Sequence, residues 1–534
     1  MGNKVLVLGL DGFTWKTLDY LGKDLEMKNL EKLRENSAWG TLKSTTPPNT
    51  IPAWISFATG CNPGKHGVFD FLKPSTDLSD VSPVCSRDIK VDTLQQLIKR
   101  NGLKSVIFNL PGSTPALTDD ITIGGFLSAK KDNIYPPELK ELDEIKNSPD
   151  IKYEGGLMLE DRRVALKKIL QRLEWRLKLG KRLFSEKWDF YFILVSETDM
   201  LQHIIFDQIK KGKLDDSIKK SVIDIYRKID DALGWYSENI DDKTYMIIVS
   251  DHGFDSYDYL FSLKNFLRQN NLTAFHKAGK GEPEYLKKRW SGKSERANLD
   301  VSPAINFMYA RPFTRKILDA GRNVYRRLVL SVPLAKYVGI KGYRMYVDPS
   351  NSIAMPLTID GFSVYLNKKS RFRNGIIEND ARELEKIKTL LENEKSPFTG
   401  ESPFRKIHYA KDFYSGSHTH EGPDILIELK DHAIIGDAHF SDVYYKTNKN
   451  YHNMDGIFAI SGPGINKGNV SDKHLIDIAP TVLHLMGLAV PSHMDGVPAT
   501  GTFGNMDSVR RSDSSKLTEL KSRIKRLRQK EANR

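Results

Sequence analysis

The sequence contains few cysteines and no long hydrophobic run. Only two of its 534 residues are cysteine, Cys61 and Cys85, which excludes a disulfide-rich scaffold and a thiolate metal cluster. We expect both to be packed thiols. No apolar run reaches the roughly 18 residues that a membrane-spanning helix needs. The basic and then apolar start of the chain is interrupted at Asp11 and lacks a small-residue cleavage site, so we predict a globular, cytoplasmic protein.

Acidic residues are outnumbered by basic ones. The chain has 81 Lys and Arg residues against 68 Asp and Glu residues, which gives a formal net charge of +13. A basic protein favours polyanionic partners: a phosphorylated small-molecule or lipid substrate, nucleic acid, or an anionic membrane face. Charge alone does not choose among these classes.

Apolar runs of strand length alternate with stretches of helical period through the first half of the chain. Residues 162–187 and 214–240 have the helical period. The strand-like runs are 5–10, 39–44, 105–110, 190–196 and 245–250. This alternation predicts an α/β fold with a three-layer α/β/α core, in which helices cover both faces of a mainly parallel sheet.

The alternation stops after residue 253. Basic side chains then crowd between Arg311 and Arg344, with leucines and valines between them. The general interpretation of this stretch is an amphipathic basic element on the surface. The more specific interpretation is a lid that binds an anionic substrate or a membrane. Strand-like runs return at 362–367, 424–429 and 455–462. The predicted division is a catalytic core in two parts, 1–253 and 346–505, an insertion or cap, 254–345, and a charged tail, 506–534, with the pattern of a mobile helix.

A short helix is predicted to begin at Thr50. Pro47 and Pro48 cannot continue a strand, Pro52 is acceptable in a first helical turn, and Gly60 suits a position just past a helix end. Unpaired backbone N–H groups and the helix dipole attract anions at such a start. The hydroxyl of Thr50 is therefore either a cap, which is the usual role of a threonine before a helix, or a nucleophile.

Acidic and imidazole side chains follow or precede predicted core strands. Asp199 and His203 are four residues apart, so they share one face of a helix. Asp251 and His252 are adjacent and must lie on a turn, which Gly253 allows. The full set is Asp11, Asp199, His203, Asp251, His252 and His452. Ligands gather at the carboxyl ends of strands in open α/β sheets, so we expect these side chains to converge.

Three carboxylates and three imidazoles fit two borderline cations. Zinc fits best and manganese is the alternative, because imidazole is a poor ligand for magnesium or calcium. Two cations roughly 4 Å apart can clamp the attacking and leaving oxygens of an in-line displacement. Thr50 would supply the attacking oxygen, since a metal can lower the pKa of its hydroxyl.

The motifs around these residues resemble the alkaline phosphatase superfamily, and within it the type I phosphodiesterase and nucleotide pyrophosphatase branch. They are Leu10-Asp11-Gly12, Pro48 to Trp54, Thr59-Gly60 with Pro63 to Gly67, Thr198-Asp199 with His203, Ser250 to Gly253, and His452 to Gly456. Pro480-Thr481 and Met494 to Gly496 extend the resemblance, which covers residues 1 to about 500 apart from the insertion.

The resemblance implies an alkaline phosphatase-like core and a role for each candidate residue. Asp199, His203 and His452 match the ligands of one zinc ion. Asp11, Asp251 and His252 match those of a second ion, which also touches the nucleophile at Thr50. The implied reaction is attack by Thr50 on phosphorus, followed by hydrolysis of the covalent intermediate.

One position departs from the pattern of the better-known nucleotide pyrophosphatases. Phe71 stands near the place where those proteins have an asparagine that binds a phosphate oxygen, so nucleotide specificity does not follow from the resemblance. The same site could act on phosphomonoesters, sulfate esters or phosphonates, or transfer a headgroup. A non-enzymatic alternative is a basic protein that binds polyanions or membranes. Lys65 and His66 could assist catalysis or serve the turn in which they lie.

Overall fold

The computed structural model describes residues 2–22, 25–78, 81–125, 133–149, 161–276, 346–358, 361–431, 433–435, 442–502 and 509–512. Most of the predicted basic insertion and nearly all of the predicted tail lie outside these residues, so both stay predictions. None of the described helices is long and apolar enough to cross a membrane. The cytoplasmic location also stays a prediction.

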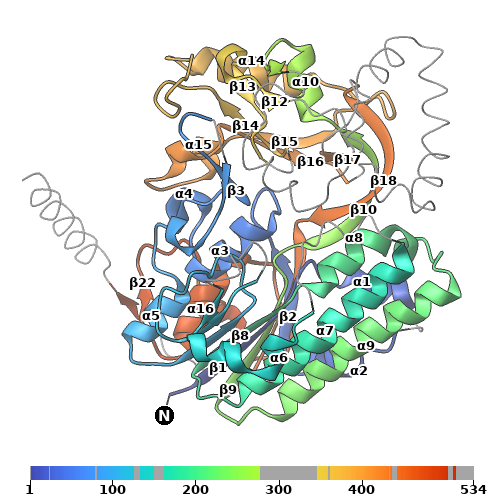
Figure 1. Ribbon diagram of the computed structural model, residues 1–534, viewed down its shortest axis with the longest axis vertical. Helices are drawn as coiled ribbons and strands as arrows, with labels where there is room; N and C mark the ends of the chain where they lie inside the picture. The colour runs from blue at the N-terminus through green and yellow to red at the C-terminus, as the bar shows by residue number, and fades with distance from the viewer. Residues whose placement is uncertain are drawn as a thin grey trace, which may run out of the picture.

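A large mixed sheet forms the centre of the molecule (Figure 1). Its middle strands are parallel: β1 pairs with β8 and β9, and β5 continues the parallel pairing from β8 to β6. β19 runs antiparallel to both of its neighbours, β2 and β9. In spatial order the strands are β20 (Gly468–Asn469), β2 (Ala38–Lys43), β19 (Asp455–Ser461), β9 (Thr244–Val249), β1 (Lys4–Leu10), β8 (Phe190–Val195), β5 (Ser105–Phe108), β6 (Ile121–Ile123) and β7 (Ile134–Tyr135), with β21 (Lys473–His474) also beside β2.

Helices cover both faces of this sheet. Side chains alternate along β1, so Leu6 and Leu8 enter one apolar cluster while Val5 and Val7 enter another. The first cluster is closed by α1 (Lys16–Leu21), α2 (Lys28–Glu35), α7 (Arg162–Phe184), α8 (Glu197–Lys210) and α9 (Asp216–Glu238). The second is closed by α3 (Thr50–Thr59), α5 (Leu94–Arg100) and α16 (Ile478–Leu485). The α/β class and the mostly parallel central sheet are therefore confirmed.

A second group of sheets, the small lobe, is built from the described residues between 253 and 453 and lies at the top of Figure 1. It has its own buried apolar cluster, which includes Phe261, Val364 and Ile427. Its elements are β10 (Gly253–Phe261), α10 (Leu263–Gln269), β13 (Ala354–Met355), β14 (Ser363–Leu366), α14 (Ala381–Glu392), β15 (Phe404–Tyr409), α15 (Ala410–Phe413), β16 (Ile425–Leu429), β17 (Ala433–Ile435) and β18 (Tyr444–Asn453). The same stretch of the chain contains β11 (Phe275–His276) and β12 (Tyr346–Val347). The remaining described α-helices and strands are α4 (Pro63–His66), β3 (Leu72–Pro74), β4 (Val81–Pro83), α6 (Asp143–Lys146), β22 (Val490–Pro491) and β23 (Arg511–Ser512).

The small lobe corrects one sequence-based expectation. The runs at 362–367 and 424–429, which lie in the second part of the predicted catalytic core, form β14 and β16 of a separate four-stranded antiparallel sheet. The chain returns to the central sheet at Asp455. A buried apolar run predicts a strand, but its composition does not specify which sheet the strand joins.

Candidate metal centre

Four segments bring the predicted ligands to one edge of the central sheet. Asp11 follows β1 and the Asp251-His252 pair follows β9, while α8, directly after β8, carries Asp199 and His203. Because β1, β8 and β9 are parallel neighbours, their carboxyl ends lie at the same edge. His452 was predicted to lie just before a core strand, and it does: it lies on β18 of the small lobe, three residues before β19 begins. The antiparallel β19 starts beside the end of β9, so the residues just before it reach the same edge.

Asp199, His203 and His452 form the first candidate metal group. One ligand atom from each lies within 4.8 Å of the other two. The Nε2 atoms of His452 and His203 lie 3.2 Å and 3.4 Å from Asp199 Oδ1. The two Nε2 atoms are themselves 3.1 Å apart. The structure thus brings together the three residues that the resemblance assigns to one ion.

The second candidate group surrounds His252. Asp11, Asp199 and His252 offer ligand atoms within 4.8 Å of one another. His252 Nε2 lies 3.6 Å from Asp11 Oδ1 and 3.3 Å from Asp251 Oδ2. All three predicted members, Asp11, Asp251 and His252, are therefore in contact. Asp199 was predicted for the first group alone, but it reaches both groups.

Thr50 is the first residue of α3, and its side chain faces the second group. Thr50 Oγ1 lies 3.2 Å from His252 Nε2, and the residue is 9% exposed. The N-cap position belongs to Asn49, whose extended backbone precedes the helix. The hydroxyl of Thr50 thus lies next to the candidate ligands, at the helix start where backbone N–H groups attract anions.

Backbone carbonyls orient two of the imidazoles. The Nδ1 atom of His452 lies 3.0 Å from the carbonyl oxygen of Pro48, and that of His252 lies 3.1 Å from the carbonyl oxygen of Gly253. A carbonyl only accepts, so each Nδ1 carries the proton and each Nε2 keeps its lone pair. Two such Nε2 atoms directed at neighbouring carboxylates form the arrangement that a cation requires.

Burial makes this cluster electrostatically unfavourable on its own. It lowers the pKa of His203 to about 4 and that of His452 to about 3, and holds the pKa of His252 well below its usual value. Burial also raises the pKa of Asp251 well above the usual range. Neutral imidazoles and buried carboxylates are both stabilised by a divalent cation, and the nitrogen and oxygen donors suit zinc or manganese. The residues present therefore fit a pair of metal ions.

Comparison with known proteins identifies the family. The profile of the type I phosphodiesterase / nucleotide pyrophosphatase family matches residues 5–317 of this chain. The chain belongs to this family. The resemblance of the motifs to this family is confirmed, and the chain is a hydrolase of the type I phosphodiesterase / nucleotide pyrophosphatase family. The matched range contains every candidate residue except His452.

The structure is similar to those of two solved proteins of low sequence identity. The structure is similar to murine ectonucleotide pyrophosphatase / phosphodiesterase 5, with 14% identity, coverage of 91% of this chain and 95% of that chain, and a TM-score of 0.45. It is also similar to wild-type alkaline phosphatase PafA, with 13% identity, coverage of 94% of this chain and 99% of that chain, and a TM-score of 0.47. No curated protein matches the sequence.

Two hydrogen bonds that sequence reasoning missed orient the acidic residues of this family member. The indole Nε1 of Trp54 donates to Asp11 Oδ2 at 3.2 Å, and the backbone N–H of Gly12 donates to Asp251 Oδ1 at 3.2 Å. The spacing of four residues between Thr50 and Trp54 could have indicated the first contact, because it places both side chains on the same face of α3, next to the candidate site. No sequence signal pointed to the second.

A buried ion pair anchors the start of α8, two residues before Asp199. The guanidinium of Arg176 donates to Glu197 through Nε at 2.8 Å and through Nη2 at 2.9 Å. Arg176 is 2% exposed and Glu197 is 0% exposed. The helical period of residues 162–187 does not indicate a partner for Arg176, so the pair was not predicted.

Lys65 and His66 serve the turn in which they lie. The backbone N–H of Val68 donates to His66 Nδ1 at 3.2 Å, so Nε2 donates to Ser56 Oγ at 2.9 Å. Burial lowers the pKa of His66 to about 3, which keeps the ring neutral. Lys65 Nζ contacts Asp495 Oδ1 at 2.5 Å. These contacts tie α4 to α3 and to the C-terminal part of the core, which favours the structural role.

Phe71 has an apolar environment. It packs against a small buried cluster of Ile51, Ile55, Val68 and Val84 beside the start of α3. A phenyl ring cannot donate a hydrogen bond to a phosphate oxygen. At this position the chain therefore lacks the polar contact that an asparagine supplies in the better-known nucleotide pyrophosphatases.

Proposed function

We propose that this protein hydrolyses phosphodiester or pyrophosphate bonds with Thr50 as the nucleophile and two divalent cations, Zn²⁺ in the first place and Mn²⁺ as the alternative. Asp199, His203 and His452 would hold one ion. Asp11, Asp251 and His252 would hold the other. The observation that carries the proposal is the 3.2 Å approach of Thr50 Oγ1 to His252 inside this cluster.

The metal ions and the protein would each contribute to stabilising charge in the reaction. When bound, two cations supply positive charge that lowers the pKa of a nearby hydroxyl and neutralises the phosphoryl oxygens. The start of α3 adds backbone N–H groups and the positive end of the helix dipole on the same side as Thr50. Burial of Thr50 and the ligands excludes bulk water, which strengthens each of these interactions.

The reaction proceeds in two displacements at phosphorus. In the first, Thr50 Oγ forms a bond to phosphorus, the bond to the leaving oxygen breaks, and the leaving group departs with the hydroxyl proton. In the second, water supplies a hydroxyl to phosphorus and a proton to Thr50 Oγ. The carbonyls of Pro48 and Gly253 keep the Nε2 atoms of His452 and His252 directed at the site through both steps.

Thr50→Ala is the direct test. With zinc-loaded protein and bis-p-nitrophenyl phosphate, we expect this variant to lose activity by a factor on the order of 10³ or more, because the attacking oxygen is gone. Thr50→Ser keeps a hydroxyl and should retain measurable activity and form a covalent intermediate in which the Oγ of the introduced serine carries p-nitrophenyl phosphate. Bound zinc, measured by mass spectrometry, should stay the same in both variants. Hydrolysis by Thr50→Ala at the wild-type rate would remove Thr50 from the mechanism.

The mono- and diester preference is decided by a parallel assay. We expect bis-p-nitrophenyl phosphate to be a better substrate than p-nitrophenyl phosphate or p-nitrophenyl sulfate on the same zinc-loaded protein. A faster rate on either of the last two would reassign the site to the alternative hydrolase classes and leave the metal centre unchanged.

A further inference from the structure

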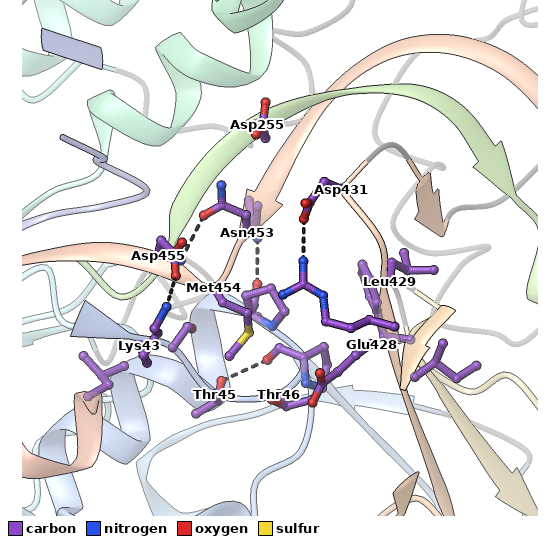
Figure 2. Close-up of a pocket in the computed structure, with 18 of the residues that line it drawn as sticks. Lys43, Thr45, Thr46, Asp255, Glu428, Leu429, Asp431, Asn453, Met454 and Asp455 are labelled. Carbon is purple, nitrogen blue, oxygen red and sulfur yellow. Dashed lines mark hydrogen bonds and ion pairs between the residues drawn. The ribbon is translucent and has the colours of Figure 1, made fainter. Parts of the chain in front are cut away.

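A cleft of about 900 Å³ lies between the central sheet and the small lobe (Figure 2). Its walls come from both parts of the molecule: Lys43 to Thr46 at the end of β2, Leu429 to Asp431 at the end of β16, and Asn453 to Asp455 where β18 meets β19. Ligand pockets in proteins commonly measure roughly 300–1,000 Å³ and occur where two parts of a fold meet. The cleft therefore has the size and the position of a small-molecule site.

This cleft shares a wall with the metal centre. Pro47, Pro48 and His452 line it, and among the described lining residues His452 is the only candidate metal ligand. The Pro48 carbonyl accepts from Nδ1 of His452, and Pro48 lies two residues before Thr50. Tyr257, another lining residue, donates its hydroxyl to the His452 carbonyl at 2.8 Å. A molecule bound in the cleft would thus contact Pro48 and Tyr257, which hold the candidate metal ligand His452. Pro48 is also close in sequence to the proposed nucleophile Thr50.

Part of the lining of the cleft is apolar. Its buried lining side chains include Phe362, Tyr414, Ile434 and Leu475. Ser44, also a lining residue, is 8% exposed, and its hydroxyl has no hydrogen-bond partner in the structure. This lining suits an apolar molecular body with little hydrogen bonding of its own.

The charged side chains of the cleft leave a surplus of positive charge at one end. Lys43 pairs with Asp455 at 2.6 Å, and Arg405 pairs with Asp431 at 2.5 Å, as Figure 2 shows for the two acidic partners. Elsewhere in the cleft, Lys210 and Lys16 share one carboxylate, that of Asp255, at 2.5 Å and 3.7 Å. These last three residues carry one net positive charge. Asp255 and Tyr257 are two residues apart on β10, so this charge lies beside the apolar part of the lining.

We propose that the cleft binds an amphiphile with one anionic head group. The head would contact Lys16 and Lys210, and the apolar body would run along Tyr257, Phe362 and Ile434. Its occupancy would change catalysis through the shared wall, in which Pro48 holds His452. The site is separate from the proposed phosphoryl-transfer site, although its effect on rate can be measured only if that proposed function holds.

Binding is tested with decanoate on zinc-loaded full-length protein by isothermal titration calorimetry. We expect saturable binding of one decanoate per chain and at least tenfold weaker binding of decanol, which lacks the charge. The double variant Lys16→Met/Lys210→Met should weaken decanoate binding at least tenfold. The matched control is Lys228→Met, which removes a half-exposed lysine of α9 that pairs with Glu174 of α7 at 3.1 Å and should leave binding unchanged.

A second variant fills the cleft from the small lobe. Leu429→Trp adds volume on the wall that Figure 2 labels and should abolish decanoate binding while keeping basal hydrolysis and the melting temperature. This variant keeps the proposal testable if the lysine variants are unstable. Failure to detect saturable decanoate binding, or equal binding by wild type and Leu429→Trp, would overturn the proposal.

Kinetics separate an effect through the shared wall from simple competition. Saturating decanoate should change kcat for bis-p-nitrophenyl phosphate at least twofold and leave KM unchanged, and Leu429→Trp should remove this response. Competitive inhibition would show that substrate and amphiphile share one site, which contradicts the proposal. The calorimetric measurement of decanoate binding does not depend on hydrolysis, so it tests the cleft independently of the proposed role of Thr50.

Discussion

Replacing Glu197 by glutamine tests the buried ion pair that anchors α8 and, with it, two candidate ligands. Glu197 accepts three hydrogen bonds from Arg176, and the two residues are only 0% and 2% exposed. The neutral glutamine leaves the Arg176 guanidinium in the interior with the Ser196 hydroxyl, 3.2 Å from Nη2, as a neutral partner. Breaking a buried pair by removing one partner costs about 3–5 kcal/mol.

The assay is thermal unfolding combined with a zinc-affinity measurement. With an unfolding entropy of about 2.1 cal/mol/K per residue, this loss corresponds to a fall in Tm of about 3–4 °C for a chain of this length. Because Glu197 lies two residues before Asp199, zinc affinity should fall about 10–100-fold. The control Glu174→Gln breaks the half-exposed pair with Lys228 and should cost about 0–1 kcal/mol.

A double variant separates stability from positioning. Arg176→Met with Glu197→Leu replaces the pair by apolar side chains of similar size, which is often neutral or stabilising, although it also removes the carboxylate that lies 3.9 Å from Nε of the buried Arg172. We expect it to recover most of the lost Tm but not the zinc affinity, since the hydrogen bonds that fix the start of α8 are gone. If Glu197→Gln melts and binds zinc like wild type, the pair neither stabilises the fold nor positions Asp199.

Two further predictions concern single side chains. Trp54→Phe removes the indole N–H that donates to Asp11, so zinc affinity in a chelator competition should fall about 10–100-fold. The control Trp39→Phe should leave zinc affinity unchanged. Equal zinc affinity of Trp54→Phe and wild type would exclude this positioning role. The pKa of His66 is lowered to about 3 by burial, below its unfolded value near 6.5, so the unfolded state binds the extra proton. The stability that this ring contributes is present above pH 6.5 and is lost as the pH falls toward 3, at up to about 1.4 kcal/mol per pH unit. The free energy of unfolding of His66→Gln should therefore depend less steeply on pH in that window, and parallel curves would contradict the assignment.

Much of the fold and of the candidate site could be predicted because the signals are local. Each strand of the parallel centre is a short apolar run, and Asp11 and Asp251 follow such runs directly. Parallel strands place their carboxyl ends at one edge, so sequence order alone predicts convergence. The helical spacing of Asp199 and His203 likewise survives in the structure as a shared face of α8.

What could not be predicted depends on contacts between distant segments. A buried apolar run predicts a strand but does not specify which sheet the strand joins, so the separate antiparallel sheet of β14 and β16 was not predicted. The pairing of Arg176 with Glu197 links two helices and leaves no periodic trace in the sequence. The cleft forms only when the small lobe packs against the segment from Lys43 to Pro48, so no single sequence motif predicts it.

The central claim is that separated carboxylates and imidazoles hold two cations beside Thr50. Anomalous diffraction at the zinc absorption edge, from crystals of zinc-loaded protein, measures this directly. The account predicts two peaks, one among Asp199, His203 and His452 and one among Asp11, Asp251 and His252, with Thr50 next to the second. A single peak, or none at these residues while zinc binds elsewhere, would contradict it.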